Sequence, residues 1–376
     1  MKKSGRTPAQ IKQDRIEKIK SFDVNDLGKR EMQIFGLPFD PEEAQIALVP
    51  VPWEVTVSYA AGTAKGPEQI HEASFQVDLC SLEDKNFWQA GIYMEKTDAK
   101  LVHLNKKLRE KAETYIDSLE KGAMVNEDKK LQKIQSEIEE GCQYMNNWVK
   151  QTTQKCLAEG KVVGLVGGDH STPLGFLQTL AEQHNAFGIL QVDAHADLRQ
   201  AYEGFKYSHA SIMYNALEIP QVKKLVQVGI RDFCQFEVEL IEKNQNRVKT
   251  YFDYQLKQND FNGINWNKQC KTIVSQLPQK VYISFDIDGL EPSLCPNTGT
   301  PVAGGLTYAQ ALYLMEQVVL SGRQIIGFDL VEVANGETDW DANVAARLLY
   351  NMARQARASQ QRKAQPTKAP KRSNKK

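Results

Sequence analysis

The sequence has no apolar run that approaches the length of a membrane-spanning helix, and no apolar segment follows its basic N-terminal stretch, residues 1–15. These absences argue against a transmembrane protein and against a secretory signal peptide. The six cysteines are widely scattered without a CxxC pair, a pattern typical of reduced thiols rather than of a disulfide framework. We therefore expect a cytoplasmic protein without a membrane partner.

The chain also lacks an excess of charge of either sign, because 47 Lys/Arg residues balance 47 Asp/Glu residues. Nine Lys/Arg and no Asp/Glu lie from Arg354 onward, so the rest of the chain holds 38 basic and 47 acidic residues. Because nucleic-acid recognition depends on clustered positive charge, the acidic main part gives no sign of a nucleic-acid partner.

A chain of 376 residues, of which 41% are hydrophobic, can bury one large core. We divide it into a polar N-terminal extension over residues 1–44, a main domain over residues 45–357 and a basic tail over residues 358–376. The tail has no apolar residue larger than Ala, so we expect it to be disordered. Residues 95–160 are strongly charged and helical in pattern, which suggests an insertion with a solvated face or an oligomer contact.

From residue 161 onward, short apolar segments alternate with helical ones, which is typical of a parallel sheet covered by helices on both faces. The expected strands are residues 46–51, 162–166, 187–192, 225–230, 281–287 and 324–333. In such sheets ligands bind at the carboxyl ends of the strands, and the polar clusters of this sequence lie at those ends.

The most informative stretch is QVDAHAD, residues 191–197, which follows an apolar strand. Side chains at i, i+2 and i+4 of an extended chain share one face, so Asp193, His195 and Asp197 point the same way. Two carboxylates this close repel each other unless a positive charge lies between them, and a divalent metal ion is the usual one. Taken alone, the stretch could also be a solvated strand end with a chance histidine.

Two further clusters follow other strands: His170 in GGDHS, and Asp286 with Asp288 at i and i+2. The three clusters together bring two imidazoles and four carboxylates to one edge of the sheet. One ion cannot use so many ligands, but two ions that share bridging carboxylates can. Oxygen ligands with some imidazole suit Mn²⁺ best, with Ni²⁺ as the alternative.

The clusters also resemble those of a known family. GGDHS at 167–171, DAHAD at 193–197 and SFDIDGLEP at 284–292 resemble the three signatures of the ureohydrolase family, which contains arginases and agmatinases. CPNTGTPVAGGLT at 295–307 and DLVEV at 329–333 are also similar to that family. The resemblance implies an α/β fold, a three-layer α/β/α arrangement with a central, mostly parallel eight-stranded sheet. It also implies two divalent metal ions and a homo-oligomer, a trimer or hexamer.

The resemblance assigns roles to individual residues. It implies one ion held by His170, Asp193, Asp197 and Asp286, and another held by Asp193, His195, Asp286 and Asp288. Asp197 would also orient the attacking water, Glu332 would pair with a guanidinium group, and His209 would help to protonate the leaving amine. The implied reaction is hydrolysis of a guanidino C–N bond, which releases urea.

The substrate is less well specified. Residues 198–209 show no evident counterpart of the arginase Ser and Asn that contact the substrate α-carboxylate, and burying that group unpaired is costly. An agmatine-like amine or a small guanidine, including guanidine itself, is therefore favoured over arginine. We expect Thr63, Tyr207 and Trp340 to narrow the substrate pocket.

Several alternatives stay open from the sequence. Arginase or formimidoylglutamase activity would use the same two-metal site, whereas a one-metal deacetylase would leave His170 without a role. A non-catalytic scaffold that assembles through the helical insertion and the basic tail would hold no metal. The number of metal ions per chain, two, one or none, separates these classes.

Overall fold

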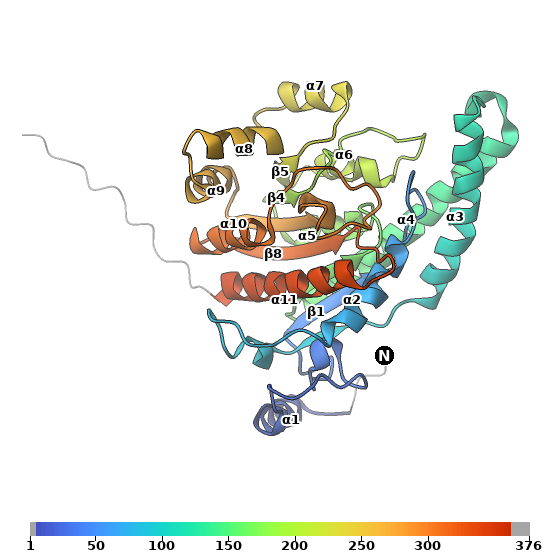
Figure 1. The fold of residues 1–376 in the computed structure, drawn as a ribbon. Coiled ribbons are helices and arrows are strands. Elements are labelled where there is room, and N and C mark those ends of the chain that lie inside the picture. Colours follow the sequence, from blue (N-terminus) through green and yellow to red (C-terminus); the bar gives the residue numbers. More distant parts are fainter. Residues whose placement is uncertain (1–4, 362–376) are drawn as a thin grey trace, which may run out of the picture.

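The computed structural model describes residues 5–361, so the expected disordered tail lies outside the described residues except for residues 358–361. At its centre is one eight-stranded sheet with the order β2-β1-β3-β8-β7-β4-β5-β6, in which all neighbouring strands run parallel. Helices surround this sheet (Figure 1). The strands are β1 (Ile46–Val51), β2 (Ile92–Met94), β3 (Val162–Gly167), β4 (Phe187–Val192), β5 (Val222–Ile230), β6 (Val248–Phe252), β7 (Lys280–Asp286) and β8 (Gln324–Val331). The predicted parallel eight-stranded sheet is confirmed.

Helices cover the sheet, which explains why its central strands are almost entirely buried. Every residue of β1, β3 and β4 is buried, as expected for parallel strands covered on both faces. The helices are α1 (Pro8–Ser21), α2 (Gly66–Ser74), α3 (Ala99–Glu120), α4 (Lys129–Ala158), α5 (Leu174–Gln183), α6 (Ile212–Leu217), α7 (Gln235–Lys243), α8 (Asp253–Phe261), α9 (Trp266–Ser275), α10 (Tyr308–Leu320) and α11 (Trp340–Gln361). Within residues 5–361, no helix combines the length and apolar character needed to cross a bilayer.

The charged stretch 95–160 forms two helices, α3 and α4, that pack against each other and extend beyond the sheet in Figure 1. Part of this helix pair nevertheless packs on the sheet. The second half of α4 buries Met145, Val149 and Cys156, and the helix packs against β1, β3 and α5. The stretch therefore contributes one of the helices that cover the sheet, in addition to its solvated face.

Both ends of the main domain differ from the sequence-based boundaries. Ile34, Leu37 and Phe39, which lie in the predicted polar extension, are fully buried in the core. At the other end α11 continues to Gln361, and the buried Ser359 hydroxyl accepts a hydrogen bond from the Ile325 backbone N–H at 2.9 Å. The helix thus includes the first four residues of the predicted tail.

The sheet order brings the three polar clusters together. His170 follows β3, Asp193 follows β4, and Asp286 ends β7. These strands, with β8 among them, are the four consecutive central strands β3-β8-β7-β4. Because all four run parallel, their carboxyl ends meet at the middle of one sheet edge.

Candidate metal centre and its cavity

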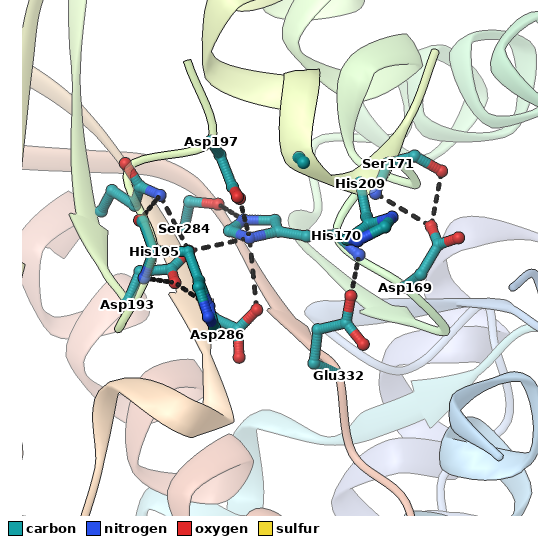
Figure 2. A network of polar contacts seen from close by, with 12 residues as sticks. Asp169, His170, Ser171, Asp193, His195, Asp197, His209, Ser284, Asp286 and Glu332 are labelled. Carbon is teal, nitrogen blue, oxygen red and sulfur yellow. Dashed lines mark hydrogen bonds and ion pairs between the residues drawn. The ribbon is translucent and has the colours of Figure 1, made fainter. Parts of the chain in front are cut away.

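His170 lies at the centre of the first ligand group. Its Nδ1 atom is 2.9 Å from Asp193 Oδ2, 2.9 Å from Asp197 Oδ2 and 3.3 Å from Asp286 Oδ2 (Figure 2). All four side chains are buried. Nδ1 nevertheless makes no hydrogen bond of normal geometry. One proton on Nδ1 could serve only one of the three carboxylates, whereas a cation could serve all of them.

A second ligand group adjoins the first and shares Asp193 with it. His195 Nδ1 lies 3.0 Å from Asp288 Oδ2 and 3.6 Å from Asp193 Oδ1. Asp288 Oδ2 is buried and has no hydrogen-bond partner. Asp193 therefore directs one carboxylate oxygen toward each histidine, the arrangement that a bridging ligand requires. Asp286, the other predicted bridge, approaches His170, and its Oδ1 accepts the Asp288 N–H at 2.9 Å.

The electrostatics of the cluster favour bound cations. Burial and the charges of Asp288 and Asp193 raise the pKa of Asp286 well above its usual value. Burial and the charge of Asp193 likewise raise the pKa of Asp197 to about 7. Without a cation, Asp286 and Asp197 therefore tend to take up protons. Two divalent cations would balance the four carboxylates, so the residues present fit a two-metal centre.

A second layer of contacts orients these ligands. His170 Nε2 lies 2.9 Å from the Ser284 hydroxyl, which in turn donates to the Asp329 carboxylate at 2.9 Å. Because the hydroxyl proton points to Asp329, the Ser284 oxygen accepts from His170 Nε2, which leaves the Nδ1 lone pair free for a cation. Gln191 Nε2 donates to Asp193 Oδ2 at 2.8 Å.

The sequence analysis missed Ser284 and Asp329. Strand alternation places Ser284 on the same face as Asp286, which was the available signal. Its pairing with Asp329 depends on the register of β7 and β8, in which the two residues are direct partners.

Both predicted catalytic carboxylates belong to residues with a left-handed backbone conformation. Asp197 has φ of 54° and Glu332 has φ of 62°, values that non-glycine residues seldom adopt. The surrounding chain holds both in place, since the Asp197 carbonyl accepts from the Met213 and Tyr214 N–H groups at 3.0 and 3.2 Å. Glu332 donates its N–H to the Gly168 carbonyl at 2.8 Å. Such strain concentrates at functional sites, where it aims a side chain.

Gly168 allows the chain that follows β3 to approach the backbone of Trp53 closely. A Cβ atom there would lie 1.8 Å from the Trp53 carbonyl oxygen, so only glycine fits. The close approach lets the Asp169 N–H donate to the Trp53 carbonyl at 2.8 Å. The next residue, His170, donates its N–H to Glu332 Oε1 at 2.8 Å. The GGDHS turn thereby fixes both a ligand and the predicted guanidinium-binding carboxylate.

A cavity of about 440 Å³ opens onto this cluster. Of the predicted residues it is lined by His170, His195, Asp197, His209, Asp286 and Glu332. Tyr59, Arg199, Tyr202, Asp232 and Phe233 form other parts of its wall. Burial and the charges of His195 and His170 lower the pKa of His209 to about 3, so its imidazole is neutral at neutral pH. The three predicted catalytic residues therefore share one cavity with three further predicted ligands.

The predicted pocket residues Thr63, Tyr207 and Trp340 do not line this cavity. Thr63 is buried, with its hydroxyl 3.4 Å from Glu54 Oε2. Tyr207 lines a neighbouring cavity. Trp340 begins α11, is 45% exposed, and donates its indole N–H to the Ser293 carbonyl at 2.9 Å. This cavity therefore gives no support to their predicted role, since the loop paths that set which side chains reach it cannot be read from residue type.

Comparison with known proteins adds to this geometry. Residues 44–356 match the family model described as "Arginase family". N(1)-aminopropylagmatine ureohydrolase of Thermus thermophilus is 31% identical over 320 residues, which cover 85% of this chain and 92% of that protein. Guanidinobutyrase of Pseudomonas aeruginosa is 31% identical over 217 residues, 54% of this chain and 63% of that protein. Among solved structures, agmatine ureohydrolase of Thermoplasma volcanium superposes with a TM-score of 0.66 at 21% identity, covering 91% of this chain and 98% of the other.

Proposed function

The chain belongs to the arginase family, and we propose that it hydrolyses the C–N bond of a small guanidino compound and releases urea. Relatives named ureohydrolase or agmatinase place it among the amidinohydrolases. The observation that carries the proposal is the position of Asp193, which directs one oxygen to His170 and the other to His195, two histidines that line the cavity.

The metal ions would be held by the residues described above: His170, Asp193, His195, Asp197, Asp286 and Asp288. When bound, two divalent ions would lower the pKa of water and supply a nucleophile near neutral pH. We propose Mn²⁺ as the ion, with Ni²⁺ as the alternative, because carboxylate oxygens outnumber imidazole nitrogens in the set.

The remaining steps belong to side chains in the cavity wall. Glu332, with Oε1 fixed by the His170 N–H, would pair with the guanidinium group through charge-assisted hydrogen bonds. Asp197 would accept a hydrogen bond from the attacking water and orient it. His209, neutral at neutral pH, would take up a proton at a ring nitrogen and pass it to the leaving amine.

The substrate that we propose is an agmatine-like amine or a small guanidine, including guanidine itself, rather than arginine. The two named relatives do not decide between these classes, since one is named for an aminopropyl-substituted agmatine and the other for guanidinobutyrate. A homo-oligomer, a trimer or hexamer, stays a prediction from the family resemblance, and a cytoplasmic location stays a prediction from the sequence. Light scattering during size-exclusion chromatography would test the subunit number.

A screen for urea release tests the proposed function. Protein loaded with Mn²⁺ or Ni²⁺ would be incubated with arginine, agmatine, guanidine and guanidino acids, and with formimidoylglutamate, which would release formamide instead. We expect urea from a compound other than arginine. Glu332→Gln should abolish the release while retaining bound metal by elemental analysis. Absence of urea from every compound with either metal would overturn the proposal, and arginine as the best substrate would overturn its second part.

A further inference from the structure

Arg199 is a cation in the cavity wall to which the proposed reaction gives no role. It follows the DAHAD stretch by two residues, and its backbone N–H donates to the Ala210 carbonyl at 3.1 Å. Its guanidinium lies over the ring of Tyr202, 4.7 Å from the ring centroid. Within residues 5–361, that guanidinium forms no salt bridge and no hydrogen bond. Arg199 is therefore a positioned but unpaired positive charge beside the reacting centre.

Two other acidic residues of the same wall, Glu237 and Asp232, do not pair with the Arg199 guanidinium. Glu237 is buried, and its two carboxylate oxygens accept the backbone N–H groups of Leu198 at 2.9 Å and Cys234 at 2.8 Å. Asp232 has a side chain that is 65% exposed, and its Oδ2 lies 3.9 Å from His195 Nε2. Both carboxylates thus have partners of their own, whereas the Arg199 guanidinium has only an aromatic face.

A guanidinium stacked on an aromatic ring is held in one plane and presents N–H groups in a fork that matches a carboxylate. Because the ring already restricts the guanidinium, less side-chain conformational entropy is lost when a substrate binds to it. By contrast, a substrate ammonium in this cavity would face a like charge. Residues 198–209, which show no evident counterpart of the arginase Ser and Asn, thus contain a cation whose chemistry suits a carboxylate.

We propose that Arg199 is a specificity-determining residue that binds the carboxylate of an ω-guanidino acid and disfavours substrates with a terminal ammonium. The inference rests on the proposed urea-releasing reaction and changes the proposed substrate, because it replaces an agmatine-like amine with an ω-guanidino acid. Arginine also stays disfavoured, because its α-ammonium would lie beside the same guanidinium.

The test compares 4-guanidinobutyrate with agmatine, two chains of similar length that end in opposite charges. The measured quantity is the ratio of their kcat/KM values for urea release, acid over amine. Hydrogen bonds to charged groups correspond to about 10- to 100-fold in an equilibrium or rate constant, so we expect the ratio to favour the acid by that factor. Arg199→Gln should lower the ratio by a similar factor, mainly through the KM of the acid, and Arg199→Lys should give an intermediate value.

Lys206→Gln provides the matched control, because it removes one positive charge nearby. Lys206 is exposed, and its ammonium lies 5.3 Å from the ring centroid of Tyr207, in the wall of the neighbouring cavity. This variant should retain the wild-type ratio. Circular dichroism would confirm that each variant is folded.

Three results would overturn the proposal while the proposed function stands. These are a wild-type ratio that favours agmatine, a ratio unchanged in Arg199→Gln, and urea release from unsubstituted guanidine alone. A preference for agmatine would indicate that Asp232, in the same cavity wall, binds the substrate ammonium instead. Absence of urea from every guanidino compound would overturn the proposed function and this inference together.

Discussion

Replacement of Ser284 by Ala tests whether the second layer of contacts controls metal binding at one position only. In the native protein Ser284 accepts from His170 Nε2 at 2.9 Å and donates to Asp329 at 2.9 Å. Ser284→Ala removes both contacts and leaves Asp329 with the Phe285 N–H at 3.2 Å. The His170 ring then has no partner that keeps its proton on Nε2, so part of the population carries the proton on Nδ1, the atom that faces the metal.

The size of the effect follows from this geometry. Loss of an outer partner of a ligating histidine typically lowers metal affinity by about 10- to 100-fold, or about 1.4–2.7 kcal/mol. His170 belongs to only one of the two ligand groups, whereas the other contains Asp193, His195 and Asp288. One ion should therefore bind more weakly by that factor, and the affinity for the other should change little.

Calorimetric titration of chelator-treated protein with Mn²⁺ resolves the two binding steps without reliance on turnover. Ser171→Ala is the matched control, because it removes the same hydroxyl group from a buried serine beside His170. The Ser171 hydroxyl contacts Asp169 at 2.5 Å rather than the His170 ring, so this variant should retain both affinities. Equal weakening of both steps in Ser284→Ala, or no weakening of either, would refute the proposed orientation of His170.

Four shorter predictions concern other residues. Asp193→Asn should lose both metal ions by elemental analysis, since this residue belongs to both ligand groups, and retention of one full equivalent would contradict the bridge. Glu54→Ala should lower the free energy of unfolding by about 2 kcal/mol in urea denaturation, because its carboxylate accepts two loop N–H groups. Thr63→Ala, which removes only a 3.4 Å contact to that carboxylate, should cost less than about 1 kcal/mol and leave substrate preference unchanged. Truncation after Gln361 should not alter the melting temperature, whereas a cut that also removes Ser359 should lower stability by about 1–3 kcal/mol, since it leaves a buried backbone N–H unpaired.

Sequence periodicity located the central strands well. The expected strands at residues 46–51 and 187–192 coincide with β1 and β4, because each is an apolar run that is interrupted at most by one polar residue, Gln191 in β4. The short edge strands β2 and β6 were missed. β6 has only one fully buried residue, Val248, so its pattern resembles that of a loop, and β2 has three residues, too few for a period to show.

The sequence by itself determined the candidate ligands, because their spacing within DAHAD and SFDID and their places after apolar strands are local properties. It also determined the family, since these motifs are specific. Only the tertiary structure decided which side chains share the cavity. The adjacency of β7 and β8 pairs Ser284 with Asp329, and the path of the loop after β4 places Arg199 in the wall while Tyr207 points elsewhere. These relations depend on strand order and loop path, which arise from packing between segments far apart in the chain and leave no periodic signal in either segment alone.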